Sequence, residues 1–255
     1  GGFRSQIGGT TNIVYNPKSR EVESDFLSLA GTARNCAGGP TPWNTWITCE
    51  ETVIRKRDEK DEETAVKGRE TEEKPDPWCH LEHAHGYNFE VLATSEMGLC
   101  DPIPLKDMSR FNHEAVAVDS SSGVVYQTED RDDGLNTRFI PNEPGNLPAG
   151  GTLQALVVKG SHSCDTRNWP DTGKPKFPVE ETLDVEWLTI EDVDNREDGM
   201  REVAYKAGSA CFARGEGMWY DDHKIYFAYT SGGIAKSGQV FIYRPSPFEG
   251  TEDER

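Results

Sequence analysis

The stretch His113-Glu114-Ala115-Val116-Ala117-Val118-Asp119 continues through a turn to Val125-Tyr126-Gln127-Thr128-Glu129-Asp130, and the pattern occurs again later in the chain. The second copy is Gly215-Glu216-Gly217-Met218-Trp219-Tyr220-Asp221, followed by Ile225-Tyr226-Phe227-Ala228-Tyr229-Thr230. In both copies the glutamate precedes the aspartate by five residues and the threonine by fourteen. Residues 46–51 (WITCEE) and 85–91 (HGYNFEV) indicate a third, earlier copy. Radial repetition of short antiparallel strands builds a β-propeller, so the repeat predicts that fold.

The other apolar segments also favour an all-β protein. They are short, they alternate with polar residues, and they are rich in β-branched and aromatic side chains. Glycine and proline, at 25 and 15 residues, separate them, and we find no long segment with sustained helical periodicity. The predicted strands cover residues 45–49, 87–91, 115–118, 124–128, 153–158, 224–230 and 239–243.

We expect a single domain over residues 1–255, a partial β-propeller. The repeats supply three or four blades, too few to close a ring comfortably, and the chain ends in the acidic segment 249–255 soon after a strand. Blades are therefore expected to be missing at the C-terminal end. Two segments interrupt the pattern: residues 55–77 are predicted to be a charged loop insertion, and residues 160–205 a long polar insertion with one strand at 185–190.

The charge of the chain limits its partners. It carries 45 acidic and 27 basic residues, a formal charge of -18. Nucleic acids and anionic membrane surfaces need a basic footprint, so we expect neither as a partner. No apolar run is long enough to span a bilayer. The acidic surplus suits a protein with several cation sites, and it equally suits an ordinary solubilising surface.

Six cysteines are compatible with an oxidising compartment, although an even number does not establish disulfides. No Cys-x-x-Cys pair occurs, which excludes a zinc ribbon. The most unusual cysteine context is the Gly-rich turn of residues 35–43 (NCAGGPTPW), which contains Cys36 and is followed by Glu50 and Glu51. Carboxylates suit calcium, and thiolates suit iron or zinc, so this segment is a candidate metal site.

In a propeller the innermost strands crowd around one axis, so Glu51, Glu114 and Glu216 could meet there as metal ligands. Glu50 is a further candidate, but adjacent residues of a regular strand face opposite sides. Solvated strand-end carboxylates, and a buried structural Cys36, remain the alternatives. The acidic segment 129–133 is either part of such a site or a solvated turn. His83, His85 and His113 are expected to make local hydrogen bonds.

Arg214 lies two residues before Glu216, so both side chains are expected on the same side of a strand. A guanidinium group beside carboxylate-bound metal can bind two oxygens of a phosphate at once. We therefore predict Arg214 and Glu216 as the catalytic pair. No Gly-x-Ser-x-Gly elbow and no P-loop is present, and nothing indicates a nucleotide cofactor.

Six segments resemble the PhoX family of bacterial alkaline phosphatases, and they follow the family's order along nearly the whole chain. They are NCAGGPTPWNTWITCEET (35–52), HGYNFEV (85–91), RFNHEAVAVD (110–119), VYQTEDRDDG (125–134), VEWLTIEDVD (185–194) and FARGEGMWYDDHKIYFAYTSGGIAKSGQVFIYRP (212–245). The resemblance implies a β-propeller with calcium and ferric ions near its axis. It also implies hydrolysis of phosphate monoesters and export to the periplasm or beyond.

Carried over to this chain, the resemblance assigns Cys36 as an iron ligand and Glu50, Glu51, Glu114 and Glu216 as metal-binding carboxylates. It assigns Arg214 as the phosphate contact. We expect a monomeric, periplasmic or extracellular alkaline phosphatase that uses calcium and iron and acts on small-molecule phosphate esters. The alternatives are a non-catalytic, calcium-stabilised propeller that binds a partner, and a lactonase-like calcium propeller.

Overall fold

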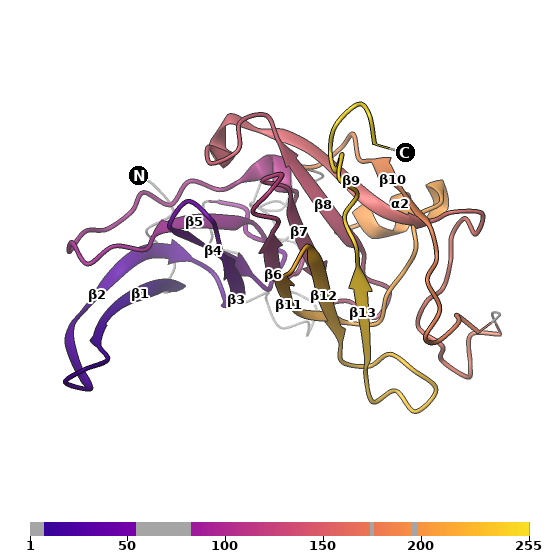
Figure 1. The fold of residues 1–255 in the computed structure, drawn as a ribbon, viewed down its shortest axis with the longest axis horizontal. Helices are drawn as coiled ribbons and strands as arrows, with labels where there is room; N and C mark the ends of the chain where they lie inside the picture. Colours follow the sequence, from indigo (N-terminus) through magenta and orange to yellow (C-terminus); the bar gives the residue numbers. More distant parts are fainter. Residues whose placement is uncertain (1–7, 55–82, 174–175, 195–197, 255) are drawn as a thin grey trace, which may run out of the picture.

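The structure is a computed structural model, and it describes residues 8–54, 83–173, 176–194 and 198–254. Antiparallel strands dominate these residues and form four sheets (Figure 1). The prediction of an all-β protein is therefore confirmed. The predicted charged loop at 55–77 lies outside the described residues.

The first of the larger sheets contains Cys36 and the segment that leads to Glu50 and Glu51. Its three strands, in spatial order, are β3 (Asn35–Pro40), β4 (Thr45–Glu50) and β5 (Asn88–Leu92). β3 corrects the prediction of a Gly-rich turn around Cys36, because the segment pairs with β4. Its glycines allow close packing: a Cβ on Gly38 would collide with the Ile47 carbonyl, and one on Gly39 with the Val116 carbonyl.

The second sheet has five strands in the order β10-β9-β8-β7-β6. The predicted strand at 185–190 exists and pairs with its neighbour as the edge of this sheet. The segment 160–205, predicted as a polar insertion, thus contributes to a sheet. The strands are β6 (His113–Val118), β7 (Val125–Glu129), β8 (Asn136–Pro141), β9 (Gly151–Val158) and β10 (Val185–Thr189).

The third sheet and a separate hairpin complete the strands. The third sheet is β11 (Gly215–Asp221), β12 (Lys224–Tyr229) and β13 (Gln239–Tyr243). The hairpin pairs β1 (Gly8–Asn16) with β2 (Glu21–Thr32), and it extends to the left in Figure 1. The sequence reasoning did not predict this hairpin.

Helical structure is sparse in the described part of the chain. The α-helix α2 (Met200–Ala207) follows the second sheet, and two 3₁₀ turns are η2 (Lys106–Met108) and η3 (Leu147–Ala149). α2 has only eight residues and no side-chain N-cap, so its sequence carries little helical signal. Within the described ranges, no helix combines the length and apolar character needed to cross a bilayer.

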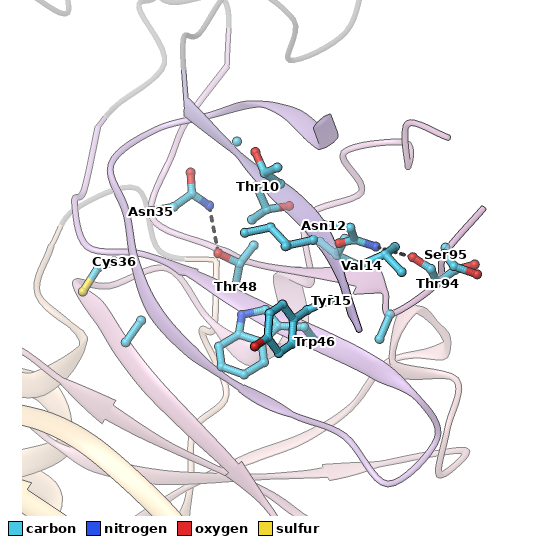
Figure 2. A pocket seen from close by; sticks show the side chains of 16 residues that line it. Thr10, Asn12, Val14, Tyr15, Asn35, Cys36, Trp46, Thr48, Thr94 and Ser95 are labelled. Atoms are coloured by element: carbon cyan, nitrogen blue, oxygen red, sulfur yellow. Dashed lines mark hydrogen bonds between the residues drawn. The ribbon is translucent and has the colours of Figure 1, made fainter. Parts of the chain in front are cut away.

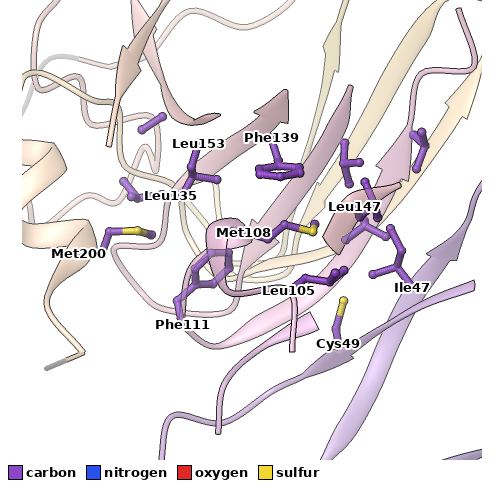
Figure 3. Packing of buried hydrophobic residues seen from close by; sticks show 14 of the residues in the cluster. Ile47, Cys49, Leu105, Met108, Phe111, Leu135, Phe139, Leu147, Leu153 and Met200 are labelled. Carbon is purple, nitrogen blue, oxygen red and sulfur yellow. The ribbon is translucent and has the colours of Figure 1, made fainter. Parts of the chain in front are cut away.

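The strands β3, β6 and β11, each the first of its sheet, pack beside one another (Figure 1). Apolar side chains fill the space between the sheets. One core joins the first and second sheets and α2, and it includes Ile47, Met108, Phe139 and Met200 (Figure 3). A second core joins the second and third sheets around Tyr126 and Phe227.

These three first strands share one local irregularity. In β3, Asn35 pairs with Glu50 but Gly38 pairs with Thr48, so one extra residue bulges from the strand. Equivalent shifts occur in β6 between His113 and Val116, and in β11 between Gly215 and Met218. β-Bulges re-aim side chains beside functional sites. The second residue of each strand, which lies in the bulge, is Cys36, Glu114 or Glu216.

The pairing also corrects the sequence repeat. His113 pairs with Glu129 and Gly215 with Tyr229, so Thr230 corresponds to Asp130 and not to Thr128. The equal glutamate-to-threonine spacing therefore misaligns the second strands by two residues. The reason is the turn, which is longer between β6 and β7 than between β11 and β12.

Candidate cation site

A thiol and two carboxylates meet where β3 and β6 begin. One possible ligand atom from each of Cys36, Glu51 and Glu114 lies within 4.8 Å of the other two. The Cys36 thiol donates a hydrogen bond to Glu114 Oε1, with a distance of 2.7 Å from Sγ. The predicted convergence of Cys36, Glu51 and Glu114, which are far apart in sequence, is thus present in the structure.

The bulges and the close strand packing explain this arrangement. Cys36 and Glu114 occupy the same position in the bulges of β3 and β6, so both side chains are directed to the junction of the two sheets. Glu51 follows the last residue of β4, and its amide donates to the Arg34 carbonyl over 3.1 Å. The absence of a side chain at Gly39 lets β3 approach β6.

Two further carboxylates lie near this group. Glu216, in the third bulge, accepts a hydrogen bond from Thr230 Oγ1 over 3.2 Å. Asp130 lies directly after β7, close enough to Glu51 to raise the pKa of that carboxyl group. Asp130 holds the place in its sheet that Glu51 holds in its own, because each follows the second strand. The sequence left Asp130 open as part of a solvated turn, but the structure buries it.

The accumulated negative charge perturbs these groups. Burial raises the pKa of Glu114 to about 7, and the nearby charges of Glu216, Glu51 and Asp130 add to the shift. The hydrogen bond from Cys36 acts in the opposite direction. Burial and Asp130 likewise raise the pKa of Glu51, although Arg34 opposes the shift. Burial and the adjacent Glu114 raise the pKa of Cys36 to about 12. A bound cation would relieve this repulsion and favour the ionised ligands.

Arg214 lies at the edge of the acidic group. Its Nε and Nη2 each donate to one oxygen of Asp130 over 2.7 Å, a bidentate ion pair. Its Nη2 is also 3.9 Å from Glu216 Oε1, so the predicted proximity of Arg214 and Glu216 is present. The Arg214 side chain remains 45% exposed, and this pairing raises its pKa.

The structure does not bring Glu50 into this group. Its carboxylate is fully buried and accepts hydrogen bonds from the amides of Ala33, Gly86 and Tyr87 at 2.7, 2.6 and 3.1 Å. The fourth contact is His85 Nδ1 at 2.8 Å. These four contacts occupy both carboxylate oxygens of Glu50, as expected for a strand residue whose side chain faces away from Glu51.

His113 also has a local role, as the sequence predicted. Its Nε2 lies 3.1 Å from the Ser109 carbonyl, and its ring stacks on Phe111. Burial lowers the pKa of His113 to about 3, so the ring is neutral at pH 7. Neutral imidazole then donates Nε2–H to Ser109.

The donor set fits a metal centre. Carboxylate oxygens with one thiol combine hard and soft ligands, as calcium and iron respectively prefer. Cys36, Glu51 and Glu114 are the residues placed to hold such ions, with Glu216 and Asp130 beside them.

A pocket adjoins this group on the side of the β1–β2 hairpin (Figure 2). The cavity has a volume of about 750 Å³, and Cys36 lines it. Asn35 and Thr48, joined by a hydrogen bond of 3.0 Å, lie beside Cys36, and Trp46 forms part of the wall. The described lining contains no lysine, arginine or carboxylate.

The fold and the site define an all-β protein with a carboxylate–thiol cluster at the junction of its sheets. A family model described as alkaline phosphatase PhoX matches residues 5–253. The chain therefore belongs to the PhoX alkaline phosphatase family.

A solved structure supports this fold. It is PhoX of Pseudomonas fluorescens in complex with vanadate, a transition state analogue, and it is 18% identical to this chain with a TM-score of 0.56. The similarity covers 94% of this chain and 50% of the other, so this chain spans half the length of that protein. A comparison with curated protein sequences gives no match.

Proposed function

We propose that this chain is a metal-dependent phosphatase that hydrolyses phosphate monoesters, with calcium and iron as its cations. The observation that carries the proposal is the convergence of Cys36, Glu51 and Glu114 beside Arg214 in a member of the PhoX family. When bound, the cations supply Lewis-acid stabilisation of the charge on the phosphoryl oxygens.

The residues of the chain have distinct roles in this proposal. Cys36, Glu51, Glu114 and Glu216 hold and orient the cations. Arg214 binds the phosphate through its planar donors. The pocket beside Cys36 receives the alcohol part of the ester, since it is open, uncharged and next to the cluster. The Pseudomonas PhoX is in complex with vanadate, a transition state analogue, which supports an oxyanion as the ligand proposed here.

The same proposal extends to architecture and location. The side-by-side first strands of three sheets support a β-propeller arranged around the cluster. We extend the proposal to a monomer, and the family resemblance supports export to the periplasm or beyond. Sedimentation of the purified protein and fractionation of cells that produce it check these two points.

The test of activity is hydrolysis of 4-nitrophenyl phosphate with calcium and iron present, before and after chelation. Activity should disappear on chelation and return with the cations. Glu216→Gln should lower the rate at least about 10-fold, whereas Glu202→Gln on the exposed face of α2 should not. Activity that resists chelation, or full activity in Glu216→Gln, would contradict the proposal. Calcium binding without hydrolysis of any ester would favour a binding module.

A further inference from the structure

Arg34 and Arg214 occupy the same position in two different sheets. Each directly precedes the bulged first strand, and each has left-handed backbone, with φ of 49° and 58°. The carbonyl of each accepts the amide that follows the second strand: Glu51 N donates to Arg34 and Thr230 N to Arg214, at 3.1 and 3.0 Å. Non-glycine residues seldom adopt this conformation, and such strain is concentrated at functional sites.

Their side chains flank the acidic group. Arg34 Nη2 lies 3.2 Å from Glu51 Oε2, and Arg214 forms its bidentate pair with Asp130. Glu51 and Asp130 lie close to each other. The four side chains thus form a row with a guanidinium group at each end and two carboxylates between.

The equivalent residue of the second sheet shows what a purely structural side chain does at this position. Asn112 also accepts the amide after its second strand, from Asp130 at 3.0 Å. It is buried, and its Nδ2 donates to the Asp130 carbonyl. Arg34, by contrast, is 67% exposed, so a ligand can reach its guanidinium group.

We infer that Arg34 is a second oxyanion-binding residue, which contacts the phosphoryl group from the side opposite Arg214. The inference rests on the proposed function. Cations on Glu51 would share its charge and weaken its pair with Arg34, which frees guanidinium donors for the anion. A phosphoryl group offers several oxygens, so two planar guanidinium groups can bind different oxygens of the same group.

The test compares Arg34→Gln, which removes the charge, with Arg34→Lys, which keeps the charge but loses the fork. Arg20→Gln is the matched control, because Arg20 is exposed and left-handed, with φ of 62°, in the turn of the β1–β2 hairpin. For each protein loaded with calcium and iron, calorimetry measures the binding of inorganic phosphate and of vanadate. Elemental analysis gives the cation content, and kinetics give KM and kcat.

Arg34→Gln should weaken phosphate and vanadate binding about 10-fold and raise KM similarly, with the cation content unchanged. Arg34→Lys should fall between wild type and Arg34→Gln, and Arg20→Gln should match wild type. Unchanged phosphate affinity in Arg34→Gln would overturn the inference, and so would weaker binding explained by lost cations. A wild type that binds phosphate but hydrolyses no ester would defeat the proposed function alone.

Discussion

Glu50 and Glu51 are adjacent acidic residues in different surroundings. Glu50 is buried beneath three backbone amides and His85, whereas Glu51 faces the carboxylate–thiol group. Strand alternation separates the two side chains, and the end of β4 fixes where the alternation stops. Glu50 is therefore a structural carboxylate, and Glu51 is a candidate ligand.

Glu50→Gln should destabilise the protein by about 2–4 kcal/mol, because an amide cannot accept all the hydrogen bonds that the carboxylate accepts. Glu51→Gln should leave the stability of the cation-free protein unchanged or higher, because it removes a carboxylate with a raised pKa from an acidic group. Urea unfolding in the presence of a chelator measures both effects.

Calcium titration by calorimetry then compares the calcium affinities of Glu50→Gln and Glu51→Gln. Affinity should fall in Glu51→Gln and persist in Glu50→Gln at a temperature where that variant is folded. A stable Glu50→Gln variant that has lost calcium binding would contradict the roles assigned to the two residues.

The first strands depend on glycines for their contact. A Cβ on Gly39 would meet the carbonyl oxygen and Cγ2 of Val116 in β6, and backbone atoms cannot move aside cheaply. Gly39→Ala should therefore cost about 1–3 kcal/mol of stability and weaken cation binding by displacing Cys36. Gly98→Ala is the control, since nothing lies within 4 Å of its Cβ position. Equal stability of the two variants would show that β3 and β6 do not need this contact.

This strand also shows what the sequence could predict. The repeated glutamates indicated convergence, because Glu114 and Glu216 are each the second residue of their strands, β6 and β11. The sequence Asn35-Cys36-Ala37-Gly38-Gly39-Pro40 has no β-branched residue and two glycines, so local propensity indicated a turn. Tertiary packing makes it a strand. The role of Asp130 was likewise hidden, because different turn lengths shift the second strands by two residues.

The C-terminal segment is fixed to β8 by an ion-pair network. Arg138 donates two hydrogen bonds to Glu254 and one to Glu249, at 2.6, 2.8 and 2.6 Å. Its guanidinium group also lies over the Trp187 ring. Burial alone would raise the pKa of Glu254, but the hydrogen bonds from Arg138 and the Gly250 amide outweigh it and lower the pKa.

This shift predicts a dependence of stability on pH. Since the folded-state pKa of Glu254 is below its unfolded value of 4.5, ionised Glu254 stabilises the protein above pH 4.5. The contribution is lost as the pH falls through the folded-state pKa. The free energy of unfolding of wild type should therefore exceed that of Glu254→Gln by about 2 kcal/mol at pH 6. This difference should vanish in acid. Urea unfolding across this range measures it, and a constant difference would refute the assignment.

The arrangement of the sheets brings candidate ligands from separate parts of the chain close together. Cys36, Glu51 and Glu114 come from two sheets, and Glu216 comes from a third. The repeat predicted that Glu51, Glu114 and Glu216 would meet, and the structure groups Glu51 and Glu114 with Cys36 and places Glu216 nearby. Strand alternation already set Glu50 apart from Glu51, but the sequence could not predict Asp130 as an addition, because that depends on turn lengths.

The placement of cations in the folded protein tests this account most directly. Crystals grown with calcium and iron, with data collected above and below the iron absorption edge, would locate iron by its anomalous signal. We predict iron bonded to Cys36 Sγ, and calcium or iron bonded to Glu51 and Glu114. Fully occupied cations that lie elsewhere, with these three side chains bound only to one another and to water, would contradict it.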